Sequence, residues 1–428
     1  MPPQRQLGLV SASGLVVASM IGSGVFTTSG LMLEELRAPA FVLVAWLMGG
    51  GLALLGAVSY GALARRFPES GGEYLFLTRT WHPAAGYVAG WISLLAGFSA
   101  PLAAVALAFG QYIQPYLPPS TPIVSGSCLL GAFALLHASD VQRGAGLQTA
   151  AVFLKLFLIA TLLGWGAPHL NPVIAPVSES FSVGAFALCV VWVSFSYSGW
   201  NAAVYIGSEI RNPEHNLPRA MVLGTAVVTA VYMALNTVFV YAAPVEQLSG
   251  KLEIARVAAQ ALGGPPFAHL VTGLIALALA TAVSSMLMAG PRVFARMADD
   301  GCLPRWFRFP ADGPPRRAIL LQCALALILL WTATFKTLLT YVGFTLGLCS
   351  AAAVAGLIRL RFVEGPQLPV PGWPWVPATF VAGMVVITGS TMLQKPFASA
   401  VGLATALLGG LVWYFAHGKT GKSDYLEP

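Results

Sequence analysis

The most regular feature of the sequence is a series of long apolar runs separated by short polar stretches. A helix that crosses a bilayer needs about 20 mostly apolar residues, and these runs have about that length. The stretches between them, such as RRFPESGGEY and RNPEHNLPRA, are rich in Pro, Gly and charge, which is typical of a chain leaving the bilayer. Twelve transmembrane helices are predicted, at residues 7–30, 38–64, 84–113, 123–140, 147–166, 182–207, 219–243, 267–290, 317–334, 337–359, 375–393 and 397–416.

Composition supports this interpretation and leaves no room for a large soluble domain. Of the 428 residues, 57% are hydrophobic and 9% are charged, whereas a soluble domain carries about 25% charged residues. We therefore predict an all-α polytopic membrane protein. It is expected to consist of one transmembrane domain over residues 1–416 and a short cytoplasmic tail over residues 417–428.

Charge is distributed unevenly between the two sides of the predicted membrane. Lys and Arg number 17 on the side of both termini and 5 on the opposite side, and Lys155 lies in mid-span. Because cytoplasmic loops carry an excess of positive charge, both termini are predicted to be cytoplasmic in a multi-pass protein of the cell membrane. This bias also accounts for the net charge of +7, so it gives no reason to expect a nucleic-acid partner.

Two of the predicted helices, the first and the sixth, are interrupted by small residues near mid-span. The first contains MIGSGVFTTSG at residues 20–30, and the sixth contains FSYSGWN at residues 195–201. Close packing of two helices explains either motif taken alone. Interruptions at corresponding places in two halves, however, are typical of a transporter site built from an inverted repeat.

The chemistry of an unwound segment suggests a type of ligand. Free N–H groups at the N-terminal end of a half-helix attract a carboxylate, while free carbonyl groups attract an ammonium group. A zwitterionic amino acid carries both groups. The two interrupted segments contain no Asp, Glu, Lys, Arg or His, which favours a neutral side chain because a charged one would lack a partner.

Five motifs, in order along the chain, make the sequence similar to a known superfamily. They are IGSGVF, PESGGEY, FSYSGWN, EIRNPEHNLPRA and GPRVFARMADDGCLP. Together they resemble the signatures of the amino acid-polyamine-organocation superfamily, and FSYSGWN most resembles its L-type amino acid transporter branch and bacterial relatives. The resemblance implies a five-plus-five inverted repeat with discontinuous helices 1 and 6, plus two C-terminal helices. The repeats would span about residues 7–166 and 182–359, followed by helices 11 and 12 at about residues 375–416.

The resemblance also implies which atoms hold the substrate. The main-chain amides of Ser23, Gly24 and Val25 would bind the carboxylate, and the Ser23 hydroxyl is a further candidate donor. The ammonium group would be held by the main-chain carbonyls of Ile21, Phe195 and Ser198.

Several side chains are expected near the substrate. They are Met20, Tyr197, Ser198, Trp200 and Asn201, with Trp200 as a gate or as a packing residue. Asn201 and Asn236 are polar groups in apolar spans, so each is expected to pair with the other or with the unwound backbone, or to contact the substrate.

Lys155 is the basic residue predicted at the centre of a span, and an ionisable group at that depth is a functional hypothesis by default. In the family, a Lys in helix 5 occupies the place of the ion in sodium-coupled relatives. This implies sodium independence, with Ser284 and Ser285 as expected neighbours. Either a fixed ammonium group that permits exchange or facilitated transport, or proton coupling, is compatible with the sequence, and so is an exporter of the same fold.

On the cytoplasmic side, acidic and basic residues of the loop motifs are expected either to pair as an inner gate or to be simply solvated. They are Glu69, Glu73, Glu209, Arg211 and Arg292.

Other function classes find little support in the sequence. It contains no H-E-x-x-H, G-x-S-x-G or Walker motif, so no enzyme, catalytic residue, metal site or cofactor is predicted. The five cysteines show no pairing pattern and none lies in a predicted outer loop, so no disulfide-linked partner is expected. The predicted partners are a small amino acid substrate and membrane lipid.

Overall fold

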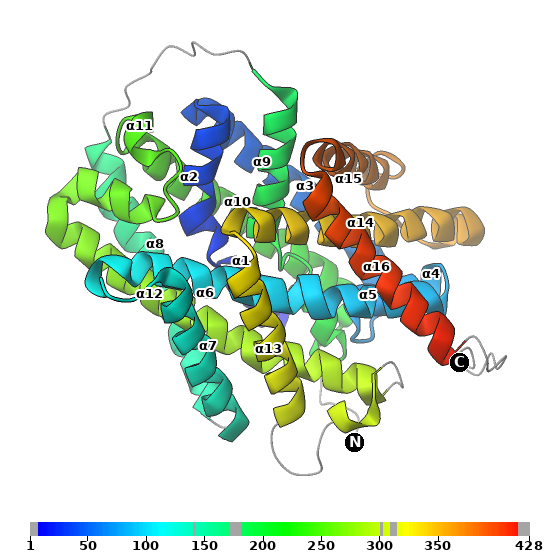
Figure 1. The fold of residues 1–428 in the computed structure, drawn as a ribbon. Coiled ribbons are helices and arrows are strands. Elements are labelled where there is room, and N and C mark those ends of the chain that lie inside the picture. The colour runs from blue at the N-terminus through cyan, green and yellow to red at the C-terminus, as the bar shows by residue number, and fades with distance from the viewer. Residues whose placement is uncertain (1–6, 140–142, 171–180, 300–302, 309–314, 418–428) are drawn as a thin grey trace.

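The computed structural model describes residues 7–139, 143–170, 181–299, 303–308 and 315–417. In this part of the chain nearly all regular structure is helical (Figure 1). The helices of the first half are α1 (Leu9–Met20), α2 (Gly24–Leu36), α3 (Pro39–Arg66), α4 (Gly72–Thr80), α5 (Pro83–Ile92), the π-helix η1 (Ser93–Ser99), α6 (Ala100–Ile113), η2 (Gln114–Tyr116), α7 (Pro122–Ser139), α8 (Arg143–Gly166) and η3 (Ala167–His169). Those of the second half are α9 (Val183–Tyr197), η4 (Ala202–Glu209), α10 (Pro213–Tyr241), α11 (Val245–Leu248), α12 (Ile254–Asp299), η5 (Arg305–Phe307), α13 (Arg316–Thr332), α14 (Phe335–Glu364), η6 (Gly365–Gln367), α15 (Trp375–Gln394) and α16 (Pro396–His417).

Every predicted apolar run coincides with a helix or with a broken pair of helices, so the protein is an all-α membrane protein of twelve spans. Eight of the described helical stretches are long and apolar enough to cross a bilayer, and the pair α1 and α2, bent by 42°, makes a ninth. The helices α7, α8 and α13 account for the other three predicted runs.

Several predicted boundaries differ from the structure. The first run continues to Leu36, because the chain stays helical until Arg37 adopts a left-handed conformation at φ 52°. The seventh begins earlier, at Pro213, since a proline fits the first turn of a helix. The eighth is preceded by another helical stretch, from which it is separated by a kink at Gly264 with φ 69°.

Corresponding helices of the two halves pack against each other. The second helices of the halves, α3 and α10, are in contact, as are the third helices, represented by α6 and α12. Among the broken helices, α2 packs on α9 and α1 packs on α10. This arrangement places the two interruptions at the centre of the bundle.

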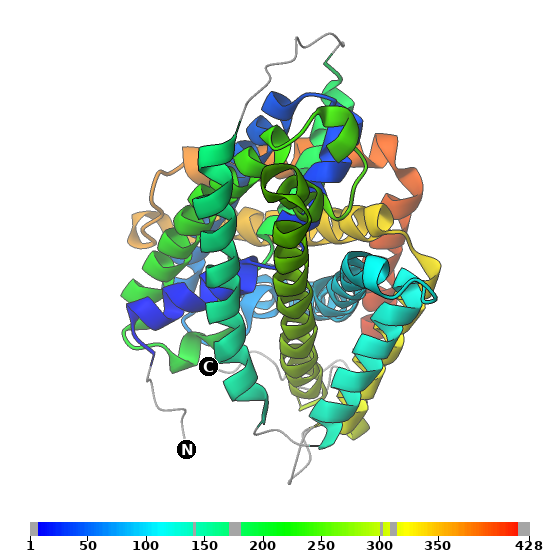
Figure 2. The ribbon, with the colours of Figure 1, turned by 90° about the vertical axis from the view of Figure 1, so that its left-hand side faces the viewer.

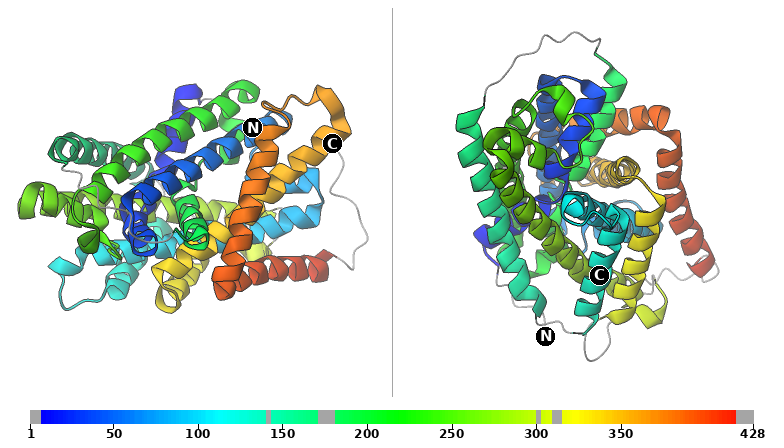
Figure 3. Two further views of the ribbon diagram at one scale, coloured as in Figure 1. Left: turned by 90° about the horizontal axis from the view of Figure 1, so that it is seen from above. Right: turned by 60° about the vertical axis from the view of Figure 1, so that its left-hand side comes forward.

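The remaining helices surround this centre. Figure 2 shows α8 alongside α12, and α7 alongside α13, in agreement with their contacts. The last two helices, α15 and α16, lie at the periphery in Figure 3, where α16 rests against α5 and α14. The bundle is therefore a ten-helix core of two repeats with two further helices on one flank.

Candidate functional site

The two helix breaks lie in direct contact. A Cβ atom on Gly24 would lie 2.3 Å from Ser196 Oγ, and a Cβ atom on Gly199 would lie 2.9 Å from the carbonyl carbon of Ser19. Gly199 also has φ 103°, a conformation that side chains disfavour. Glycine is therefore required at both breaks, for close approach at Gly24 and for both reasons at Gly199.

A tyrosine from α10 links the two breaks. The buried Tyr232 hydroxyl lies 2.5 Å from the carbonyl oxygen of Met20, the last residue of α1, and 3.1 Å from the carbonyl oxygen of Ser196, near the end of α9. The Ser196 hydroxyl lies 3.1 Å from that of Thr28 in α2. Carbonyl groups released at the ends of α1 and α9 are thus partly satisfied by one shared donor, as buried polar groups require.

The N-terminal end of α2 carries free donors. Within the described residues, no hydrogen bond has a main-chain N–H of Ser23, Gly24 or Val25 as its donor. The Ser23 hydroxyl is also buried without a partner in this part of the chain. Unpaired N–H groups at a helix N-terminus form a typical anion site, so a carboxylate would fit here.

A cavity of about 600 Å³ lies beside the breaks, on the side of α1 and η4. Helix α2, all of whose residues the structure describes, contributes nothing to its lining. The cavity thus occupies the half of the molecule that the charge bias assigns to the cytoplasm. The predicted site residues that line it are Ile21, Lys155, Phe195, Tyr197, Ser198, Trp200, Asn201 and Ser285.

The remaining predicted site residues lie behind the cavity wall. All are buried, and the cavity approaches them at Ile21 and Gly22. They are Met20, Ser23, Gly24, Val25, Asn236 and Ser284.

Lys155 faces the same cavity from α8. It forms no hydrogen bond or ion pair with any residue that the structure describes. Of its two expected neighbours, Ser285 lines the cavity, whereas the Ser284 hydroxyl pairs with His137 Nε2 of α7 at 2.8 Å. Among the described lining residues, Lys155 is thus the lysine of the cavity that the broken first helix also lines, with Ser285 on the α12 wall.

Of the alternatives left open for Asn201 and Asn236, their pairing with each other is wrong. The Asn236 side chain accepts a hydrogen bond from Ser29 of α2 and donates one to the Tyr232 carbonyl oxygen at 2.8 Å. Ser29 in turn accepts a hydrogen bond from Trp46 Nε1 at 2.8 Å. Asn236 thus ties α2 to α10, because an amide in an apolar bundle bonds to the nearest polar group on an adjacent helix.

For Glu73, neither of the two alternatives, an ion pair or a solvated side chain, is found among the described residues, because the side chain is buried among neutral groups. Its carboxylate accepts hydrogen bonds from three neutral groups, the hydroxyls of Tyr60 and Tyr205 and the amide of Asn201. Glu69 and Glu209 form no ion pair within the described residues.

Of the two arginines expected at this inner gate, only Arg211 can be placed. Its main-chain N–H donates to the Leu7 carbonyl oxygen at 2.9 Å. The Arg292 side chain lies outside the described part of the chain.

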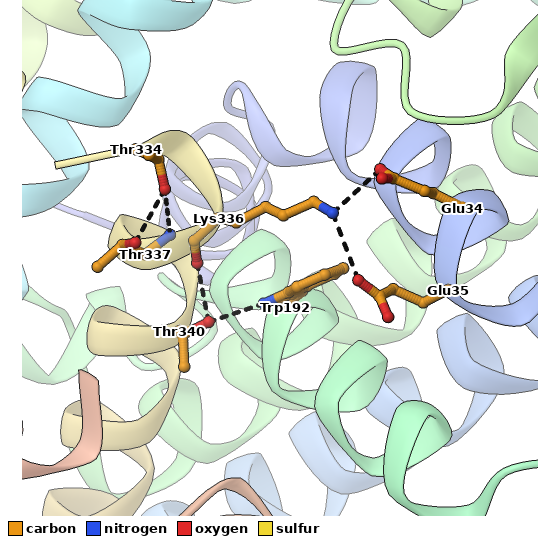
Figure 4. A network of polar contacts seen from close by, with 7 residues as sticks. All are labelled: Glu34, Glu35, Trp192, Thr334, Lys336, Thr337 and Thr340. Carbon is orange, nitrogen blue, oxygen red and sulfur yellow. Dashed lines mark hydrogen bonds and ion pairs between the residues drawn. The ribbon is translucent and has the colours of Figure 1, made fainter. Parts of the chain in front are cut away.

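The opposite side of the bundle is closed by a cluster that the sequence did not reveal. Figure 4 shows the Lys336 side chain of α14 extended toward the end of α2, where it lies 3.0 Å from Glu34 and 3.3 Å from Glu35. Its ammonium group also lies 5.6 Å from the ring centroid of Trp192 in α9. The Trp192 indole donates to the Thr340 hydroxyl at 2.9 Å. These contacts join α2, α9 and α14 above the breaks.

Comparisons with known proteins agree with this architecture. The family model described as Amino acid permease matches residues 7–416. The human protein named Large neutral amino acids transporter small subunit 2 is 30% identical, over 99% of this chain and 83% of its own length. The mouse Asc-type amino acid transporter 1 is 26% identical, over 96% of this chain and 81% of its own length. The Serine/threonine exchanger SteT of Bacillus subtilis (strain 168) is 27% identical, over 96% of both chains.

Proposed function

Because the chain belongs to the amino acid permease family, and is therefore an amino acid transporter and not an enzyme, we propose that it transports neutral L-amino acids without sodium. Transport would proceed by exchange or facilitated diffusion with alternating access. The main supporting observation is that the two helix breaks meet beside one cavity. Just behind the cavity wall, the main-chain N–H groups of Ser23, Gly24 and Val25 donate no hydrogen bond to any described residue. Main-chain groups of this kind bind the backbone of any amino acid, so the side chain of the substrate is recognised by the cavity.

The proposed pose follows from the polarity of the half-helices. The substrate carboxylate would bind the amides at the start of α2, and its ammonium group the carbonyls of Ile21, Phe195 and Ser198. A neutral side chain is favoured, since both interrupted segments lack ionisable residues. The names of the three relatives, which describe a large neutral amino acid transporter, an Asc-type transporter and a serine/threonine exchanger, support this class of substrate and an exchange mechanism.

Sodium independence is proposed from Lys155. Its ammonium group faces the cavity beside the broken first helix, where a positive charge can replace a bound cation. We also propose that the protein is a multi-pass protein of the cell membrane with both termini in the cytoplasm. It would act without a disulfide-linked partner, because no cysteine lies in a predicted outer loop.

Transport into proteoliposomes tests this proposal. A panel of radiolabelled amino acids is offered with and without internal amino acid, a sodium gradient and a pH gradient. We expect saturable uptake of neutral amino acids that depends on internal substrate and not on sodium. If a pH gradient drives uptake into empty vesicles, the mechanism is proton symport and not exchange. Sodium-driven uptake would overturn the role given to Lys155. If no amino acid is transported, the proposed function is wrong.

A further inference from the structure

Glu73 is a buried carboxylate on the wall of the cavity, in the first turn of α4. It is 7% exposed, and its Oε1 accepts a hydrogen bond from the Tyr60 hydroxyl at 3.1 Å. The same oxygen accepts from Asn201 Nδ2, and Oε2 accepts from the Tyr205 hydroxyl. Among the described residues, no Lys, Arg or His forms an ion pair with it. Its partners are thus three neutral donors, two of which belong to the cytoplasmic half of the broken sixth helix.

The two glycines that precede Glu73 allow this contact. Gly71 and Gly72 have φ 158° and 56°, which lets the chain turn sharply into α4. A Cβ atom on Gly72 would lie 2.4 Å from the Tyr205 ring. Glycine at this position therefore allows Tyr205 to approach α4 closely enough to reach the Glu73 carboxylate.

The carboxylate also fixes how Asn201 is presented. An ionised carboxylate only accepts hydrogen bonds, so the Asn201 amide must turn its Nδ2 toward Glu73. This leaves Asn201 Oδ1 as an acceptor at a position that lines the cavity. The neighbouring Trp200 is held in turn by Tyr60, with ring centroids 4.6 Å apart. The buried Glu73 carboxylate therefore fixes the side chains of both Asn201 and Trp200, at the end of the second helix break.

We propose that Glu73 is a positioning residue for transport, which acts by holding Asn201 and Tyr205 so that Asn201 Oδ1 meets the ammonium group of an amino acid in the cytoplasmic half of the cavity. The proposal rests on the transport function proposed above. An acceptor oxygen beside a buried carboxylate favours a cationic group, since the negative charge strengthens the attraction in a site of low dielectric. When the carboxylate is lost, the side chain at position 73 no longer accepts hydrogen bonds from all three donors. The Asn201 side chain is then free to rotate.

Exchange kinetics of purified variants in proteoliposomes test this role. We expect Glu73→Gln to raise KM for substrate on the cytoplasmic side about tenfold, a factor equivalent to about 1.4 kcal/mol, with kcat changed far less. Asn201→Ala should raise KM similarly, and the double variant should resemble either single variant because both lose the same interaction. Tyr205→Phe removes one donor and keeps the charge, so it should raise KM about threefold even if Glu73→Gln folds poorly.

The matched control is Ser70→Ala. Ser70 also joins this loop to η4, through a hydroxyl 2.6 Å from that of Ser208, but it does not contact Glu73. It should leave KM within about twofold of wild type, as expected for an exposed pair of neutral hydroxyls. An equal rise in KM for Ser70→Ala would show that docking of the loop, and not the carboxylate, is what matters.

Binding can be followed without transport through Cys349, which lines the same cavity. In a variant whose other cysteines are replaced, substrate should protect Cys349 from a membrane-impermeant maleimide, and Glu73→Gln should require about tenfold more substrate for equal protection. Unchanged KM and protection in Glu73→Gln and Tyr205→Phe, or effects of Glu73→Gln and Asn201→Ala that multiply, would overturn the inference while wild-type transport stands. If the wild type neither transports nor is protected by any amino acid, the proposed function fails and this inference falls with it.

Discussion

At the scale of single residues, the site depends on small side chains and on a few buried polar groups. Gly24 and Gly199 allow the two breaks to touch, and the Tyr232 hydroxyl bonds to the carbonyls that the breaks release. Lys155 supplies one positive charge to the same cavity. Gly24 and Gly199 allow close contacts that alanine would obstruct, and Tyr232 makes hydrogen bonds that phenylalanine cannot make.

Gly24→Ala should abolish most transport. The added methyl group would lie within 2.7 Å of the Ser196 Cα, so the backbone of one break must move. We expect destabilisation of about 1–3 kcal/mol, the usual cost of overpacking, and a loss of transport larger than the loss of folded protein. Gly14→Ala is the control, because a Cβ atom on Gly14 of α1 meets nothing within 4 Å. Transport and melting temperature are measured for both variants, and a normal rate for Gly24→Ala contradicts the close contact of the breaks.

Lys155→Ala should lower the rate of exchange by about tenfold or more, equivalent to about 1.4 kcal/mol or more in the transport barrier. The reason is that the cavity then lacks the charge that stands opposite the broken first helix. Thr161→Ala on the same helix is the control, because the partly exposed Thr161 hydroxyl bonds, among the described residues, only to the carbonyl of Phe157. Rates are measured in proteoliposomes at equal protein content. Wild-type rates for Lys155→Ala would remove this residue from the mechanism.

Sequence reasoning reached the region of the site but not its side-chain contacts. The interruptions at residues 20–25 and 195–201 could be predicted because clustered Gly and Ser interrupt an apolar run. The side-chain partners of Asn236 and Glu73 could not be predicted, since they lie 13 to 207 positions away along the chain. A tyrosine in an aliphatic span needs a hydrogen-bond partner for its hydroxyl. This rule was the one indication in the sequence that Tyr60, Tyr205 and Tyr232 make polar contacts.

At the scale of helices, the two broken elements explain how one side can close while the other holds a cavity. Helices α2 and α9 pack together, with Thr28 bonded to Ser196 near the end of α9, while α1 and η4 border the cavity. The apolar pattern predicted all twelve spans because bilayer thickness sets their length. It did not predict the helical stretch before Gly264, which is too polar and too short to resemble a span.

Lys336→Gln should weaken closure on the outer side. Its partners are partly exposed, with 49% of the Glu34 side chain and 28% of the Glu35 side chain accessible, so each pair is worth about 0–1 kcal/mol. The contact with Trp192 adds about 0.5–1 kcal/mol. We therefore expect about a three- to tenfold rise in labelling of a Thr28→Cys variant by a membrane-impermeant maleimide added outside, since 1.4 kcal/mol corresponds to about tenfold.

The matched control for this experiment is Lys251→Gln, because the Lys251 side chain forms no ion pair within the described residues. The Lys251→Gln substitution should leave the rate of labelling of the Thr28→Cys variant unchanged. Equal labelling in the two lysine variants would show that the Lys336 cluster does not hold the outer side closed.

At the scale of the whole molecule, the fold is two repeats that share one central site. Contacts between α3 and α10, and between α6 and α12, pair corresponding helices across the repeats. The site therefore lies where the repeats meet, which is the usual position in transporters with repeated halves. Composition and length alone predicted the membrane class, because 9% charged residues cannot cover a soluble surface of this size.

Orientation is a prediction of the whole chain. The excess of Lys and Arg on one side predicts that both termini are cytoplasmic. Tags fused to either end should be accessible to antibody or protease only after the cells are permeabilised. A single cysteine placed at Lys251, on the opposite side, should be labelled in intact cells. Labelling of a terminal tag in intact cells would reverse the assignment of the cavity to the cytoplasmic side.

An amino acid is expected to bind through its backbone at the two helix breaks, and an experimental structure with a transported neutral amino acid bound would show whether it does. The substrate carboxylate should lie within hydrogen-bonding distance of the N–H groups of Ser23, Gly24 and Val25. The ammonium group should face the carbonyls of Ile21, Phe195 and Ser198, with the side chain in the cavity. A substrate bound with its carboxylate on Lys155, or at a site away from both breaks, would show that the proposed binding mode is wrong.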